Sequence, residues 1–253
     1  MIKLSFSING WKGYSWDEFV DLAKENSFKG IELHNVLGSD LMDKNGPFHK
    51  YNSAATMRKL RDDGISVPCF DISADISSDD IAANVEHIKE CIDFAFSINV
   101  PYIRVYASGD STNANENVIN CLRGFVDYAE SKNVTVLIET CGMFSDTAKL
   151  RDVLMTFACD SVAALWDVYH TYCGQGEETD VTITNLGAFV KHVHIKDSRV
   201  IDGEYINYDK IIEYKTKTSY RSEFERIQKL ITSNQTRSKK KVVRITRSRA
   251  KGG

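Results

Sequence analysis

Short apolar runs rich in β-branched residues alternate along the chain with longer stretches in which apolar residues recur every three or four positions. We expect each short run to form a strand. The runs are Leu4–Ile8, Gly30–Leu33, Ser66–Phe70, Tyr102–Tyr106, Val134–Glu139, Ala163–Asp167 and Lys191–Ile195, and their starts lie 26 to 36 residues apart. That spacing is the length of a βα unit, and strict alternation predicts a parallel sheet with helices outside it.

Signals for helix boundaries lie between these runs. Ser15 and Glu18 form a capping-box pattern, and Gly64 supplies a stop for a helix that follows Ser53. The pair Ser145 and Asp146 predicts the start of a further helix. After Ser78, a stripe of apolar residues at three- and four-residue steps predicts a buried helix face, made of Ile81, Val85, Ile88, Ile92, Ala95 and Phe96.

Seven such units in 253 residues favour an α/β fold of the TIM (β/α)8-barrel type, whose usual length is about 250 residues. An open doubly wound sheet is the alternative, but no GxGxxG phosphate loop follows the first strand. We assign residues 1–235 to a single TIM-barrel-like domain. Residues 236–253 contain eight Lys and Arg and no acidic residue, so we expect a basic, disordered tail there.

Charge and composition narrow the classes of partner. The whole chain has a net charge of −3, so residues 1–235 carry −11, and an acidic body argues against nucleic acid as a partner. No apolar run reaches the 18 or so residues of a membrane span. The N-terminus lacks the pattern of a signal peptide, and the six cysteines form no CxxC pair. We therefore expect a cytoplasmic protein without a membrane partner.

Polar residues gather where the predicted strands end. Glu139 ends the fifth strand, Asp167 ends the sixth, and His194 lies near the end of the seventh. In a TIM barrel these strand ends face one another at the mouth. Burying a carboxylate or an imidazole costs several kcal/mol unless a partner satisfies its hydrogen bonds or its charge. One divalent cation would satisfy all three, and the mixed ligand set suits Mn²⁺, Mg²⁺, Co²⁺ or Zn²⁺.

Each of these residues also has a purely structural interpretation. A carboxylate at a strand end is often salt-bridged or caps the next helix, and a buried histidine is more often a satisfied core residue than a ligand. His192, one layer deeper than His194, fits the core interpretation. Three such residues at the ends of three successive strands favour the metal site.

Several segments resemble the xylose-isomerase-like TIM-barrel superfamily, which includes sugar phosphate isomerases and epimerases. They are Ile138-Glu139-Thr140, Trp166-Asp167-Val168-Tyr169-His170 and Val193-His194-Ile195-Lys196-Asp197-Ser198, with Trp11 and Gly30-Ile31-Glu32-Leu33 in the same pattern. The likeness covers about residues 1–205. It implies that Glu139, Asp167 and His194 bind one divalent metal, most often Mn²⁺ or Mg²⁺, with Zn²⁺ and Co²⁺ as further choices.

The resemblance also implies a reaction and a set of substrate contacts. A metal chelated by a carbonyl and a neighbouring hydroxyl acidifies the adjacent C–H and stabilises an enediolate, with Glu139 as the catalytic acid/base. His170, Arg104 and Lys196 resemble residues that contact substrate oxygens or phosphate, and Glu32 and His34 join this substrate-binding set. The implied substrate is a small sugar, polyol or sugar phosphate. Because relatives often pair through their barrel mouths, a homo-oligomer is one expected state.

The sequence departs from the family pattern near its C-terminus. The family's fourth ligand, a second Glu at the end of the eighth strand, is not found. The segment from Tyr205 to Glu213 resembles the helix that leads toward that strand, and Glu213 is the nearest candidate ligand. We therefore expect the eighth βα unit to be degenerate or missing, and the C-terminal part to be atypical or truncated. Cys141 is a second departure, because many relatives carry His there.

Three functions remain open at this point. The leading one is a divalent-metal-dependent isomerase or epimerase, with dehydration of a keto-polyol as a related outcome. The alternative is a catalytically impaired, degenerate barrel that binds metal or sugar only. An abasic-site endonuclease is disfavoured, because a trinuclear zinc centre requires more His, Asp and Glu ligands than the strand ends offer, and His49 and His87 lie off those ends.

Overall fold

The computed structural model describes residues 3–11, 13–196, 198–201 and 204–207. The chain divides into two compact units, residues 1–196 and residues 197–253. In the first unit the described residues form a parallel sheet and the helices that cover it, and in the second they form a two-stranded hairpin. The domain boundary that the sequence predicts at residue 235 lies outside the described residues and stays a prediction.

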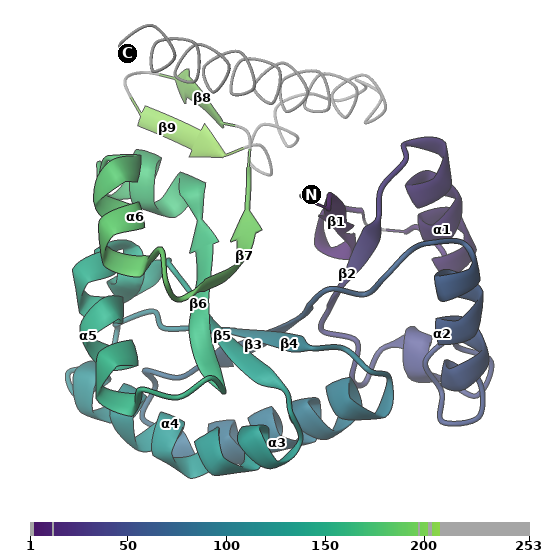
Figure 1. Cartoon of the computed structure of the whole chain (residues 1–253), viewed down its shortest axis with the longest axis horizontal. Helices are drawn as coiled ribbons and strands as arrows, with labels where there is room; N and C mark the ends of the chain where they lie inside the picture. Colours follow the sequence, from purple (N-terminus) through teal and green to yellow (C-terminus); the bar gives the residue numbers. More distant parts are fainter. Residues whose placement is uncertain (1–2, 12, 197, 202–203, 208–253) are drawn as a thin grey trace, which may run out of the picture. The chain divides into compact units, whose positions relative to one another are not determined.

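The sheet of the first unit contains seven strands in sequence order, and every neighbouring pair is parallel (Figure 1). The strands are β1 (Ser5–Ser7), β2 (Gly30–His34), β3 (Phe70–Asp75), β4 (Tyr102–Tyr106), β5 (Thr135–Glu139), β6 (Val162–Asp167) and β7 (Val190–His194). Consecutive parallel strands joined by helices are the arrangement of a TIM barrel, so the predicted fold class is confirmed.

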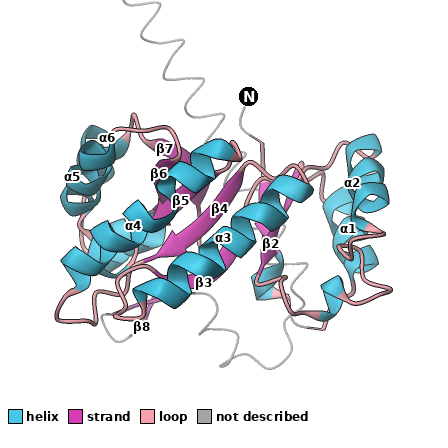
Figure 2. Ribbon diagram, turned by 90° about the horizontal axis from the view of Figure 1, so that it is seen from below, coloured by secondary structure: helices cyan, strands magenta, loops and turns pink. Residues whose placement is uncertain are grey.

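In the described part of the chain, six α-helices are present, and they cover the outer face of this sheet, as Figures 1 and 2 show. They are α1 (Trp16–Glu25), α2 (Ser53–Asp62), α3 (Ile81–Ser97), α4 (Ala114–Ser131), α5 (Thr147–Phe157) and α6 (Thr179–Leu186). Short helical turns also follow four of the strands, at Ile8–Gly10, Asp40–Met42, Gly142–Ser145 and Tyr169–Gly174. Within the described part of the chain, no helix is long and apolar enough to span a membrane.

The helix boundaries follow the predicted local signals, but one residue of a predicted buried face does not. Ser15 and Glu18 form both bonds of a capping box, and Asp146 caps α5 by accepting a bond from the Ala148 amide. Helix α3 begins at Ile81, the first residue of the predicted apolar stripe, and Asp80 is its N-cap. The prediction that Phe96 is buried is wrong, since 55% of this residue is exposed. It lies one position beyond the buried Ala95, where the helix surface has already turned toward solvent.

The third strand begins and ends later than the predicted Ser66–Phe70. Residues Ser66 and Cys69 accept hydrogen bonds from β2, but the regular ladder of β3 runs from Phe70 to Asp75. Pro68 explains the difference, because it has no N–H to donate and so interrupts regular pairing at the start of the strand. The later end carries Asp71 into the interior of the strand and not just beyond it.

Apolar side chains fill both faces of the sheet. The larger core lies between the strands and the helices, and includes Phe70, Ile92, Ile103 and Phe125. A second, smaller cluster consists of Cys69, Leu137, Ala163 and Leu165, with Tyr102 packed against it. Leu137 and Leu165 each precede a strand-end carboxylate by two residues, and side chains alternate along a strand. The inner face of the sheet is therefore apolar at one level and acidic at the next.

The second unit corrects one prediction and leaves another outside the described residues. Strands β8 (Ser198–Ile201) and β9 (Glu204–Asn207) pair antiparallel, so Tyr205–Asn207 is not helical as the sequence analysis supposed. Asp202-Gly203 is a typical hairpin turn pair, and that signal was missed. Glu213 and the remainder of the predicted eighth unit lie outside the described residues.

Helices α3 and α4 approach each other closely at Gly124, where a Cβ would lie 2.6 Å from Cγ2 of Val85. Intrinsic helix propensity favours Ala over Gly by about 1 kcal/mol. We nevertheless predict that Gly124→Ala lowers the free energy of unfolding by about 1–2 kcal/mol, because the stiff valine cannot move away from the added methyl group. Urea denaturation measures this. In the Val85→Ala background, Gly124→Ala should cost less stability than it does in the parent protein, because the clashing methyl groups are gone. A Gly124→Ala variant as stable as the parent would contradict the close packing.

Candidate metal centre

The ends of β5, β6 and β7 place three potential ligands side by side. Glu139, Asp167 and His194 are the last residues of these strands, and the register pairs Asp167 with His194 directly. One ligand atom from each residue lies within 4.8 Å of the other two. Glu139 and Asp167 are 1% and 0% exposed. The structure therefore brings together the three residues that the sequence singled out as a metal site.

Two cations already contact the carboxylates of this group. The guanidinium of Arg104, in the middle of β4, forms an ion pair with Oε2 of Glu139. The ammonium of Lys196 lies 2.7 Å from Oδ2 of Asp167 and 4.0 Å from Oε1 of Glu139. This Asp167 oxygen is fully buried and accepts no well-oriented hydrogen bond from the described residues. A carboxylate oxygen has two lone pairs, so one lone pair of this oxygen remains available to a cation beside the Lys196 ammonium.

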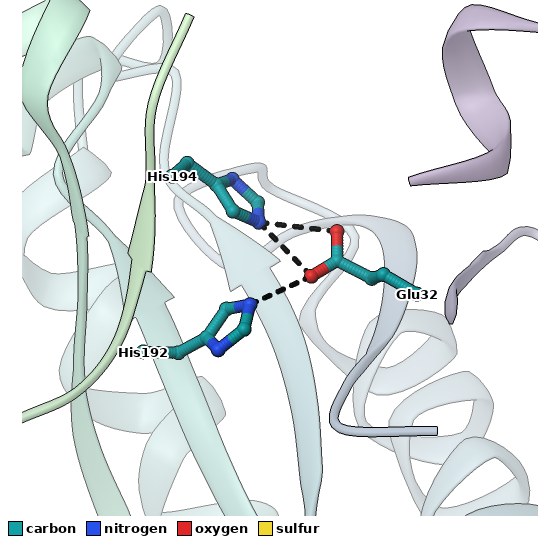
Figure 3. A group of neighbouring side chains, drawn as sticks. All are labelled: Glu32, His192 and His194. Carbon is teal, nitrogen blue, oxygen red and sulfur yellow. Dashed lines mark hydrogen bonds and ion pairs between the residues drawn. The ribbon is translucent and has the colours of Figure 1, made fainter. Parts of the chain in front are cut away.

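Glu32 on β2 reaches the histidines of β7, as Figure 3 shows. Its Oε2 lies 2.8 Å from Nε2 of His192, and its Oε1 lies 3.1 Å from Nε2 of His194. The other nitrogen of His194, Nδ1, lies 3.1 Å from Oε1 of Glu139. His194 therefore stands between two buried carboxylates, with one ring nitrogen facing each.

His34 and Arg104 meet at a fourth carboxylate, that of Asp71 on β3. Nδ1 of His34 lies 2.7 Å from Oδ2 of Asp71, and Nη1 of Arg104 lies 2.8 Å from Oδ1. Asn35 contacts the other ring nitrogen of His34 at 3.1 Å. Arg104 consequently joins Asp71 to Glu139, and this chain of contacts connects the site across β2, β3, β4 and β5.

The segment after β6 positions the remaining candidate, His170. It lies in the helical turn Tyr169–Gly174, and its backbone N–H donates to Oδ1 of Asp167 over 3.2 Å. Burial lowers the pKa of His170 and outweighs Asp167, which acts to raise it. The lowered pKa favours a neutral ring at neutral pH. Thr140 holds the backbone at Asp167, because its hydroxyl accepts a 2.8 Å hydrogen bond from the Asp167 backbone N–H.

The contacts of the cluster shift several pKa values in opposite directions. Burial alone would raise the pKa of Glu32, but hydrogen bonds from His192 and His194 outweigh it and lower the value to about 2. The pKa of Glu139 is lowered as well, since His194 and Arg104 outweigh burial. Burial would lower the pKa of His194, but bonds to Glu139 and Glu32 raise it to about 10. These shifts describe ionised carboxylates held by a protonated imidazole.

The donor set and its charge fit a divalent cation. Among the described residues, the cluster contains four buried carboxylates, those of Glu32, Asp71, Glu139 and Asp167, and two permanent cations, Arg104 and Lys196. Two negative charges are left over, which equals the charge that one divalent ion supplies. Without an ion, protons on the histidines supply this charge, and His194 is the clearest case. Oxygen and imidazole donors suit Mn²⁺, Mg²⁺, Co²⁺ and Zn²⁺.

Sequence reasoning missed two members of the cluster. Asp71 is not among the predicted site residues, and the late end of β3 is what places it level with Arg104. His192 was interpreted as a satisfied core residue, and its 2.8 Å contact with Glu32 fits that interpretation but also makes it a member of the cluster. The signal for His192 was its position two residues before His194, because alternate residues of a strand share one face.

The model of the xylose isomerase-like TIM-barrel family matches residues 20–219, which is most of the chain. The chain belongs to this family. No curated protein matches the sequence. Solved structures with low sequence identity to this chain have a similar fold. At such identities the similarity establishes the fold alone.

Three of these structures illustrate the range of the fold. The probable 3-DHS dehydratase AsbF from Bacillus anthracis is 20% identical, with a TM-score of 0.69 over 84% of this chain and 88% of that one. The IOLI protein with a bound zinc atom is 13% identical, with a TM-score of 0.65 over 81% and 78%. A D-allulose 3-epimerase from Methylomonas sp. is 16% identical, with a TM-score of 0.61 over 78% and 73%.

The raised pKa of His194 predicts how stability depends on pH. A group whose pKa rises from 6.5 to about 10 on folding contributes stability in full below about pH 6.5 and loses it as the pH approaches 10. With a chelator present, the free energy of unfolding should therefore fall over this interval in the parent protein, and fall less in His194→Gln. His87→Gln, on the outer helix α3, should retain the parental slope. Equal slopes for the parent and His194→Gln would show that this imidazole is not held between carboxylates.

Proposed function

We propose that the chain is a metal-dependent isomerase or epimerase of a small sugar, polyol or sugar phosphate, with the cation held by Glu139, Asp167 and His194. The observation that carries this proposal is the convergence of the three ligand atoms within 4.8 Å of one another. The surplus of two buried negative charges supports it, because a divalent ion would balance that surplus. The family and the epimerase among the structures of similar fold agree with the reaction class.

When bound, a divalent cation polarises a carbonyl group and acidifies the C–H bond beside it. Glu139 is the group we assign to the proton transfer. Its contacts with Arg104, His194 and Lys196 keep it ionised at neutral pH, as a base must be, although they also make it a weak base. Arg104 and Lys196 lie beside it and would bind the oxygens or the phosphate of the substrate.

The stereochemistry of the transfer favours isomerisation among the proposed reactions. One carboxylate can remove a proton from a carbon and return it to the neighbouring carbon on the same face of the substrate. Inversion at a single carbon requires a second acid on the opposite face. In the described part of the chain, Glu139 is the carboxylate positioned for the first task, and the family's second Glu is not found in the sequence. We therefore place an aldose–ketose type of isomerisation ahead of epimerisation.

A specific observation supports the alternative of a barrel that binds metal or sugar without turnover. Arg104 and Lys196 already neutralise Glu139 and Asp167, and the pKa of Glu139 is held below its usual range. A carboxylate so strongly paired accepts a proton from carbon poorly. Under this alternative the cluster would retain cation and sugar binding, and the proton transfer would be absent.

Proton exchange distinguishes the two functions. With Mn²⁺ present, the parent protein should exchange the hydrogen on the carbon next to a ketose carbonyl with D₂O, as followed by NMR over a panel of sugars and sugar phosphates. Glu139→Gln should lower the exchange rate by about 100-fold or more, because the base is lost. The matched control Glu130→Gln, on the exposed end of α4, should exchange at the parental rate.

Two results would overturn the proposal. Exchange that persists in Glu139→Gln would remove this residue from the proton transfer. Cation binding by the parent protein without exchange on any member of the panel would establish the binding-only alternative.

A further inference from the structure

We propose that Glu32, His192 and His194 form a second cation site, of the kind that binds Zn²⁺ or Co²⁺, beside the site of the proposed function. The second site uses the opposite ring nitrogen of His194 and takes its other two ligands from residues outside the Glu139–Asp167 group. The inference does not depend on whether the protein turns over a sugar.

The geometry of the three side chains supports this site. Figure 3 shows both imidazoles with a ring nitrogen turned toward the Glu32 carboxylate. Nε2 of His192 lies 2.8 Å from Oε2, and Nε2 of His194 lies 3.1 Å from Oε1 and 3.2 Å from Oε2. One ligand atom from each residue lies within 4.8 Å of the other two. In a tetrahedral zinc site with ligands about 2.0–2.1 Å from the ion, neighbouring ligand atoms are about 3.3 Å apart.

The chemistry of the donors separates this site from the neighbouring one. Two imidazoles and one carboxylate are the ligands of many catalytic zinc sites, which keep a fourth position open. Two carboxylates and one imidazole, as in the Glu139 group, are harder donors and suit Mn²⁺ or Mg²⁺ better. We therefore expect Zn²⁺ and Co²⁺ to prefer the Glu32 site and Mn²⁺ to prefer the Glu139 site.

The fold holds the donors of the second site firmly. His192 and His194 are alternate residues of β7, so the strand itself places both rings on one face. Glu32 is 2% exposed and extends from β2 to meet them. Because a carboxylate only accepts hydrogen bonds, both Nε2 atoms donate to it when no ion is bound. A cation would take the place of these hydrogens and would meet nitrogen and oxygen lone pairs directed at it.

His194 makes the two sites alternatives to each other. A neutral imidazole coordinates through one nitrogen and carries a hydrogen on the other. With an ion at the Glu32 site, the hydrogen on Nδ1 can donate to Glu139, which lies 3.1 Å away. With an ion at the Glu139 site, the hydrogen on Nε2 can donate to Glu32. The surplus of two negative charges also balances only one divalent ion. The tautomer of His194 thus determines which site is occupied.

Spectroscopy of the full-length protein with Co²⁺ and Mn²⁺ tests this assignment. In the parent protein, Co²⁺ should give the intense visible absorption of a tetrahedral site. His192→Gln should weaken Co²⁺ binding by at least tenfold and remove that absorption, whereas Mn²⁺ binding, measured by electron paramagnetic resonance, should change less than twofold. Asp167→Asn should do the reverse. His87→Gln is the matched histidine control and should leave both ions bound as in the parent.

X-ray absorption of the Zn²⁺-loaded parent protein provides a measurement that depends on no variant. Two imidazole ligands per zinc support the inference, and one imidazole with carboxylate oxygens overturns it. Retention of the cobalt spectrum in His192→Gln would also overturn it. Loss of Mn²⁺ binding alone would count against the proposed function while leaving the second site intact, so the two failures are distinguishable.

Discussion

In the part of the chain that the structure describes, four carboxylates lie buried at one end of the barrel strands against two permanent cations, and this imbalance constrains everything else at the site. Glu32, Asp71, Glu139 and Asp167 could not remain ionised there without partners, since an unpaired buried charge costs several kcal/mol or more. Arg104 bridges Asp71 and Glu139, Lys196 pairs with Asp167, and the histidines of β7 hold Glu32. Each cationic group therefore has a position fixed by the anions around it.

The fold produces this imbalance by layering the inner face of the sheet. Leu137 and Leu165 pack together inside the sheet, and two residues later Glu139 and Asp167 end the same strands. The apolar layer keeps water from one side of the carboxylates, which strengthens their interactions with any cation. A protein that needed only stability would gain more from apolar residues at these positions, and this supports the proposed binding site.

Strand ends and helix caps were predictable where local sequence signals determine them. Strand β4 was predicted with its observed ends, and the capping box of α1 is present in full. Strand β3 was misplaced because a proline interrupts its start, and the hairpin of β8 and β9 was missed because its turn signal was not considered. Helix α3 showed the same limit, since the periodicity identified its buried stripe but not the exposure of Phe96.

The site was predictable as a group of strand ends, but not as a set of pairings. The alternation of residues along β5, β6 and β7 was enough to bring Glu139, Asp167 and His194 together. No local signal shows that Glu32 on β2 meets His192 on β7, because these residues are 160 positions apart in the chain. That contact depends on how the sheet curves, which is a property of the whole fold. The same contact turns His192 from an apparent core residue into a potential ligand.

The charge imbalance is tested most directly by counting the protons that leave when a cation binds. Isothermal titration calorimetry at pH 8, in buffers with different enthalpies of ionisation, gives this number for both Mn²⁺ and Zn²⁺. Because His194 has a pKa of about 10 without metal and must lose a proton to become a ligand, the account predicts release of about one proton for each cation bound. Cation binding without proton release, or no binding of either ion, would contradict it.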